Sequence, residues 1–139
     1  MKTEKVSVNL SPVELGQIDY LVERGLYDSR SDFMRSAARK VLEGHADNIK
    51  EFLDTDGSKD GQVKFSFTMG IGALTKSEVE HAIVANTKIK IRVIGLYTIP
   101  NSITPEEIRK AVVSCKVYGK LIASKEVKAV LDELAGEER

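Results

Sequence analysis

Residues 5–42 of the chain, KVSVNLSPVELGQIDYLVERGLYDSRSDFMRSAARKVL, decide the fold of its N-terminal part. The stretch opens with six residues in which apolar and polar side chains alternate, as in a short strand with one apolar face. The apolar face consists of Val6, Val8 and Leu10, and the polar face of Lys5, Ser7 and Asn9. We therefore expect a strand whose two faces have different partners.

Two helices are predicted directly after this strand. Ser11 is a suitable N-cap for the first, Pro12 suits its first position, and the Glu14 side chain can reach back to the cap. Gly25 marks its end. The second helix is predicted from Ser29, with Asp32 as capping partner and Gly44 at its end. Apolar residues recur at helical spacing in both helices, as Leu15, Ile18, Leu21 and Val22 and then as Phe33, Ala37, Val41 and Leu42.

One short strand cannot stand alone, because its backbone groups need hydrogen-bonding partners and two short helices bury little surface. A second copy of the chain supplies the simplest remedy. Two antiparallel strands would form a ribbon, with its apolar face packed on four helices and its polar face exposed. Such a ribbon fits the DNA major groove, where Asn9 can bind adenine and Lys5 can bind guanine or a phosphate.

At this point the sequence resembles the ribbon-helix-helix family of DNA-binding repressors, of the Arc, MetJ and CopG type. The resemblance is carried by the segments VSVNLSP, ERGLYDS and SRSDFMRSAAR. It implies base contacts by Lys5, Ser7 and Asn9. It also implies phosphate contacts by Ser29, Arg30 and Ser31 at the start of the second helix, where backbone N–H groups suit an anion. The expected dimer core is Val6, Val8, Leu10, Ile18, Leu21, Phe33, Ala37 and Val41.

Composition indicates an ordinary soluble protein of one large or two small domains, with 139 residues, 42% of them hydrophobic and 30% charged. No apolar run could span a bilayer and the N-terminus lacks a secretory core, so we expect a cytoplasmic protein with no membrane partner. The single cysteine, Cys115, excludes an internal disulfide.

The charge balance is neutral, with 21 basic and 21 acidic residues, and residues 1–44 contain seven of each. Because DNA affinity depends on neutralising phosphates, a neutral domain must place its cations on one side. We expect Lys2, Lys5 and Arg30 to gather near the ribbon.

A connector is predicted over residues 45–61. It comprises a short helix over residues 45–53 and the loop DTDGSKDG at residues 54–61. The loop from Asp56 matches the first half of an EF-hand calcium loop, but Phe67 stands where that loop requires Glu. A polar turn between two domains is the alternative.

Residues 62–139 are predicted to form a small α/β or α+β domain, which gives the whole chain an α+β fold. Strands are expected over residues 62–69, 88–94 and 116–123, and capped helices from Thr75, Thr104 and Ser124, the second of them extending through Val112. Each strand has Lys opposite its apolar face, which indicates a sheet covered by helices on one side only. The resemblance implies that such a domain binds a small-molecule effector or joins dimers into tetramers.

Three weaker patterns allow more than one interpretation. Gly70 and Gly72 could cradle a phosphate, but Thr75 stands where a dinucleotide fingerprint needs its third glycine, so a tight turn is the alternative. His45, His81 and Cys115 are too scattered to predict a metal site, and no cofactor is expected. Lys88, Lys90 and Arg92 form a basic stripe that could touch DNA or protect an exposed strand edge.

Catalysis is not expected, because no Ser-His-Asp or Cys-His arrangement is indicated by the spacing. The sequence predicts a DNA-binding transcriptional regulator, a repressor that inserts an antiparallel ribbon into the major groove of double-stranded DNA as a homodimer or dimer of dimers. The alternative is an antitoxin or assembly protein that dimerises through its N-terminal part and binds protein through its C-terminal part. The capped helices and alternating strands after residue 61 predict an ordered domain, which favours the regulator.

Overall fold

The computed structural model describes residues 3–55 and 62–137. The chain divides into two compact units, Met1–Phe52 and Leu53–Arg139, and each is described here by itself. The predicted calcium-like loop lies almost wholly in residues 56–61, outside the described residues.

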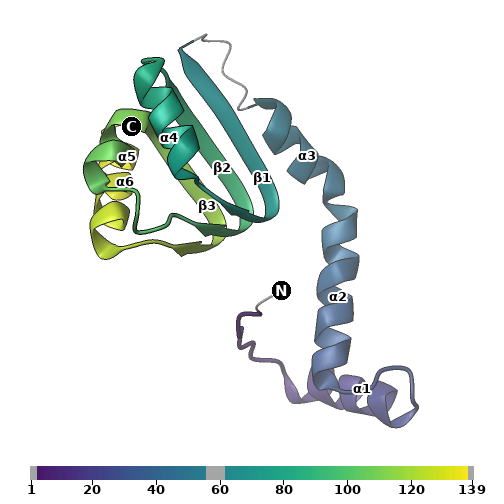
Figure 1. Ribbon diagram of the computed structural model, residues 1–139. Helices are drawn as coiled ribbons and strands as arrows, with labels where there is room; N and C mark the ends of the chain where they lie inside the picture. The colour runs from purple at the N-terminus through teal and green to yellow at the C-terminus, as the bar shows by residue number, and fades with distance from the viewer. Residues whose placement is uncertain (1–2, 56–61, 138–139) are drawn as a thin grey trace. The chain divides into compact units, whose positions relative to one another are not determined.

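The N-terminal unit is helical (Figure 1). Its helices are α1 (Pro12–Glu23), α2 (Arg30–Gly44) and α3 (Ala46–Thr55), the last of which continues into the second unit.

The predicted caps of α1 are confirmed. The Glu14 amide donates to the Ser11 hydroxyl over 3.2 Å, while the Glu14 carboxylate accepts from the Ser11 amide over 3.4 Å. Gly25, at φ 82°, adopts the left-handed conformation that ends a helix at little cost in glycine.

The start of α2 is also confirmed. The Ser29 hydroxyl accepts from the Asp32 amide over 3.0 Å. The Asp32 carboxylate in turn accepts from the Asp28 amide over 3.0 Å, one residue earlier than a standard capping box requires. These bonds satisfy backbone donors that a helix start otherwise leaves open.

No strand is present over residues 3–10 of the single chain, which begins its regular structure with α1. The predicted β-α-α order is therefore incomplete in one chain. A strand exists only through bonds to a neighbouring strand, and the expected neighbour belongs to a second copy.

The C-terminal unit is a three-stranded parallel sheet in the order β1-β2-β3, with a helix after each strand (Figure 1). Its elements are β1 (Val63–Ala73), α4 (Lys76–Val84), β2 (Lys88–Thr98), α5 (Pro105–Ala111), β3 (Val112–Ile122) and α6 (Lys125–Glu137). The three helices lie on one side of the sheet, as predicted. The expectation that Val112 belongs to a helix is wrong, because α5 ends at Ala111 and β3 begins at once.

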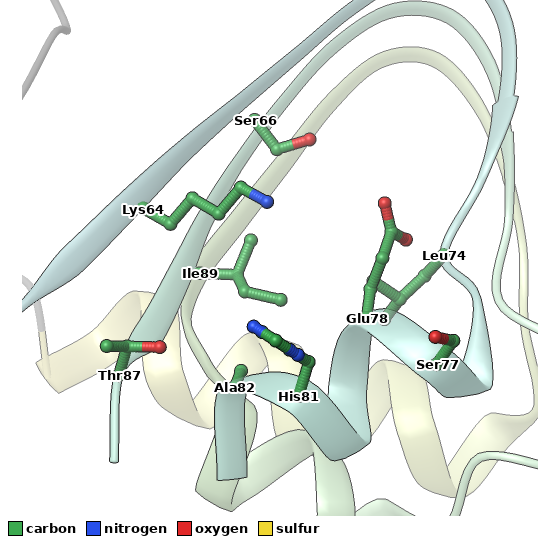
Figure 2. A pocket seen from close by; sticks show the side chains of 9 residues that line it. All are labelled: Lys64, Ser66, Leu74, Ser77, Glu78, His81, Ala82, Thr87 and Ile89. Atoms are coloured by element: carbon green, nitrogen blue, oxygen red, sulfur yellow. The ribbon is translucent and has the colours of Figure 1, made fainter. Parts of the chain in front are cut away.

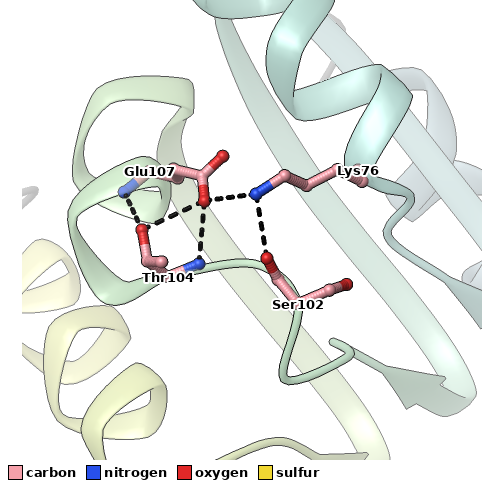
Figure 3. Close-up of polar contacts among 4 residues, drawn as sticks. All are labelled: Lys76, Ser102, Thr104 and Glu107. Atoms are coloured by element: carbon pink, nitrogen blue, oxygen red, sulfur yellow. Dashed lines mark hydrogen bonds and ion pairs between the residues drawn. The ribbon is translucent and has the colours of Figure 1, made fainter.

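The core of this unit lies between the sheet and its helices. Fully enclosed side chains include Val79 of α4, Ile91 of β2 and Ile108 of α5. The helix layer is also joined by polar contacts: Lys76 Nζ lies 2.6 Å from the Glu107 carboxylate and donates to the Ser102 carbonyl over 2.9 Å (Figure 3). One lysine thus connects the start of α4 to the start of α5.

A row of three glycines crosses the sheet. Gly70, Gly95 and Gly119 are paired in register, with φ of 113°, 136° and 124°. A Cβ at Gly95 would lie 2.0 Å from the Gly70 carbonyl oxygen, and one at Gly119 would lie 2.1 Å from that of Gly95. The predicted turn or phosphate cradle at Gly70 and Gly72 is therefore wrong, because both residues lie inside β1.

The large apolar residues of β1 face away from the helices, whereas β2 directs Ile89, Ile91 and Val93 into the core. Lys64 and Ser66 line a cavity beside α4, and a Cβ at Gly72 would lie 3.3 Å from the buried Tyr97 ring. Successive side chains of a strand point to opposite faces. Phe65 and its alternate neighbours Phe67, Met69 and Ile71 therefore point to the side without helices, which corrects the simple expectation that apolar faces all turn inward.

Candidate nucleic-acid interface

The residues expected to contact bases lie on the segment that leads into α1. Lys5, Ser7 and Asn9 are all exposed, and Ser11 at its end has the extended backbone of an N-cap. Their side chains are therefore accessible to a ligand. The single chain does not align them on a sheet, since the segment has no strand in it.

Apolar side chains of the N-terminal unit surround an open groove of about 890 Å³. Among its described residues only Ile18 is buried, with 6% of its surface exposed. Five of the eight residues expected in the dimer core line this groove, namely Leu10, Ile18, Leu21, Phe33 and Ala37. The other three are largely exposed, at 82% for Val6, 57% for Val8 and 61% for Val41.

The same groove includes apolar residues that the sequence analysis did not assign to the dimer core. Val13 and Tyr20 of α1 and Met34 of α2 line it and are exposed. The Tyr27 ring packs edge-to-face on Phe33, with centroids 5.0 Å apart, and so orients one of the groove's largest side chains. Exposed apolar patches of this kind mark protein interfaces.

At the start of α2, Arg30 is bound to α1. Its guanidinium makes two parallel hydrogen bonds to the Asp19 carboxylate, Nε to Oδ1 over 2.7 Å and a terminal nitrogen to Oδ2 over 2.8 Å. The hydrogen bond from Arg30 lowers the pKa of Asp19, and the same bond raises the pKa of Arg30. Ser29 serves as the N-cap and Ser31 is exposed beside it.

This pairing alters the predicted charge layout. Arg30, one of the three cations expected near the ribbon, is partly neutralised by Asp19, and Lys2 lies outside the described residues. Both partners are half exposed, at 60% and 47% of their side chains, and exposed ion pairs are weak. A phosphate could therefore exchange with the Asp19 carboxylate at low cost.

The basic stripe of the C-terminal unit lies on its central strand. Lys88 is exposed and Lys90 half-buried, whereas Arg92 is buried and donates to the Ser114 hydroxyl over 2.6 Å and the Ile91 carbonyl over 2.9 Å. Since β2 has a neighbour on each side, protection of a strand edge does not explain the stripe.

The soft metal ligands lie in three different places. His45 caps α2, His81 is on α4, and Cys115 is on β3, where burial raises the pKa of its thiol to about 11. Within residues 3–55 and 62–137, no three His, Cys, Asp or Glu side chains cluster as metal ligands.

A small cavity of about 190 Å³, lined by both polar and apolar side chains, lies between β1 and α4 (Figure 2). The side chains of Lys64 and Ser66 approach it from the strand, and those of Glu78 and His81 from the helix. Glu78 is held in place by its capping bond to the Thr75 amide over 2.9 Å. The cavity offers both a cationic and an anionic group to a small ligand.

None of the helices described over residues 3–55 and 62–137 combines the length and apolarity needed to cross a bilayer. Comparison with protein families gives a match to the Ribbon-Helix-Helix transcriptional regulator family over residues 1–128, which extends well beyond residues 5–42 into α6. The chain is also similar to the transcriptional regulator CdrS of Halobacterium salinarum, with 32% identity over 44 residues, 32% of this chain and 80% of that protein. No solved structure matches it.

Proposed function

Because the chain belongs to the Ribbon-Helix-Helix transcriptional regulator family, we propose that it represses transcription as a homodimer that inserts a two-stranded ribbon into the major groove of DNA. The observation that supports this most is the uncovered apolar set of the N-terminal unit. The relative that is similar over 44 residues is itself named a transcriptional regulator.

The dimer follows from what the single chain leaves exposed. Val6 and Val8 are largely exposed, and the apolar groove presents the half-buried Leu21, Phe33 and Ala37. A two-fold axis through residues 5–10 would pair the two segments antiparallel, so that the valines of both copies cover both grooves. The hydrogen-bonding needs of the strand and the exposed apolar surface are met by the same partner.

The DNA contacts then follow from the alternation of the strand. With Val6 and Val8 turned to the helices, the side chains of Lys5, Ser7 and Asn9 turn to the duplex. An Asn amide can bond both N6 and N7 of adenine, and Lys can bond guanine O6 or N7. Arg30 would leave Asp19 for a phosphate, joining Ser29 and Ser31 in positioning the dimer without specifying sequence.

The C-terminal unit fits a sensing or assembly role better than a toxin-masking one. A masking segment folds on its target, whereas this unit has its own buried core and two complete capping boxes. The cavity lined by Lys64, Glu78 and His81 is the place where a small polar effector would fit. Two such units in one dimer could also join it to another.

Selection of genomic fragments by the purified protein tests the proposal. Sequencing should reveal one enriched motif with two-fold symmetry. Asn9→Ala should relax base preference at one position of each half-site, with a loss of about 1–3 kcal/mol there. Asn101→Ala, at an exposed asparagine of the C-terminal unit, is the matched control and should leave the motif unchanged. Absence of any enriched motif, or the same motif strength with and without the Asn9 side chain, would refute base contact by this segment.

A further inference from the structure

The sheet of the C-terminal unit has one side that its own helices do not cover, here called the open face (Figure 1). Its side chains alternate with those that pack on α4, α5 and α6. The open face comprises Val63, Phe65, Phe67, Met69 and Ile71 of β1, Lys88, Lys90, Arg92, Ile94 and Leu96 of β2, and Ser114, Lys116, Tyr118, Lys120 and Ile122 of β3.

Acidic residues of this unit are absent from its sheet layer. The three strands contain no Asp or Glu, so every charged side chain on the open face is basic. Over residues 62–137 all acidic residues lie on the helices, as Glu78, Glu80, Glu106, Glu107, Glu126, Asp132, Glu133 and Glu137. A neutral chain thus carries one strongly positive surface.

Aromatic and apolar side chains lie among these cations. In register across the sheet, Phe67 is beside Arg92, which is beside Lys116, and the next row on this face ends at Tyr118. Lys116 Nζ lies 5.3 Å from the centroid of the Tyr118 ring, which is 44% exposed. The open face therefore combines rings on both outer strands with positive charge on the central strand and β3.

We propose that the open face binds single-stranded nucleic acid. Lysines neutralise the phosphate backbone, while aromatic rings stack on unpaired bases, the combination by which sequence-tolerant single-strand binding proteins act. Tyr118 is the exposed ring for this stacking, and Phe65 and Phe67 are half-buried. Phe65 and Phe67 are about 7 Å apart along β1, and β3 runs about 10 Å from β1, so several bases can lie on one face.

Other occupants fit this face less well. A second copy stacked face to face would bring one basic face against another, and opposed like charges disfavour association. A duplex keeps its bases stacked inside, where Phe67 and Tyr118 could not reach them. Arg92 is buried and held by Ser114, so it adds positive potential, whereas the exposed Lys116 provides direct phosphate contact.

Fluorescence anisotropy with labelled oligothymidylate and oligouridylate, across a salt series, tests this with the full-length protein. Tyr118→Leu keeps an apolar side chain but removes the ring, and should weaken binding about tenfold. Lys116→Glu should weaken it and flatten the salt dependence. Lys128→Glu, an equal charge change at an exposed position of α6, should change little.

Three results would overturn the proposal. One is no binding at about 100 μM protein, the weak end of ordinary non-specific affinity. Another is an equal loss of affinity from Lys116→Glu and Lys128→Glu, which would indicate general electrostatic attraction and no defined binding site. The third is a change of oligomeric state as the only effect of Tyr118→Leu. Asn9→Ala should leave single-strand binding intact, so failure here is separable from failure of the proposed operator binding.

Discussion

Replacing Val8 by Ala should weaken dimerisation by a predictable amount. Val8 is 57% exposed in the single chain, and complete burial of a valine side chain contributes about 1.5–3 kcal/mol. The share still to be gained in a dimer is roughly 1–1.7 kcal/mol, most of which is lost when Ala removes two of the three side-chain carbons. At about 1 kcal/mol per copy, two copies give about 2 kcal/mol, or about a 30-fold higher dimer dissociation constant.

Sedimentation equilibrium over a dilution series measures this constant directly. The matched control is Val84→Ala, because Val84 is 88% exposed on α4 in the other unit. That variant should dimerise like the parent protein. If the two variants have the same dissociation constant, residues 5–10 are not part of the dimer core and the ribbon is wrong.

Three further outcomes are expected. Gly95→Ala should lower the free energy of unfolding, measured by chemical denaturation, by roughly 3 kcal/mol or more, because its Cβ would lie 2.0 Å from a backbone oxygen. Gly136→Ala is the control, since the space around Gly136 is open, and should not destabilise the protein. Unchanged stability of Gly95→Ala would contradict the close approach of the strands. Asp19→Asn should raise affinity for all duplexes and steepen its salt dependence, because it releases the Arg30 guanidinium; unchanged binding in a titration would show that Arg30 contacts no phosphate. Cys115 should react with iodoacetamide far more slowly at pH 8 in the folded protein than in denaturant, because burial raises the pKa of the thiol. The reaction rate of the folded protein should rise with pH up to about pH 11. Equal rates in the folded and the denatured protein at pH 8 would contradict the burial of Cys115.

Local features of the fold could be predicted from sequence because their causes are local. Ser11 with Glu14, and Thr104 with Glu107, each satisfy backbone donors within one turn, and the structure contains both capping boxes. The three strands of the C-terminal unit also follow from alternation, although each is longer than predicted or begins earlier.

Which face of β1 turns toward the helices could not be predicted, because it depends on which side of the sheet the helices cover. Its apolar residues Phe65 and Phe67 look like a core face by alternation alone, yet the helix side receives Lys64 and Ser66 at the border of the helix layer. An edge strand there need not supply core residues. The row of Gly70, Gly95 and Gly119 could not be predicted either, because these glycines are required by the close approach of neighbouring strand backbones and not by a turn at Gly70.

The candidate site shows the same division. Exposure of Lys5, Ser7 and Asn9 agrees with their predicted role, but the bidentate contact of Arg30 with Asp19 joins residues on different helices, and no local pattern indicates it. The ribbon depends on a second chain, so neither one sequence nor one folded copy contains its hydrogen bonds.

The pairing of residues 5–10 about a two-fold axis can be measured with a nitroxide label on Ser7→Cys in a Cys115→Ser background. In an antiparallel ribbon the two labelled backbones lie about 5–10 Å apart, so the electron paramagnetic resonance spectrum of the dimer should show strong dipolar broadening. Mixing with an excess of unlabelled protein should remove this broadening. An unbroadened spectrum at concentrations where the protein is dimeric, or a protein that stays monomeric, would contradict the ribbon and the DNA-binding account that depends on it.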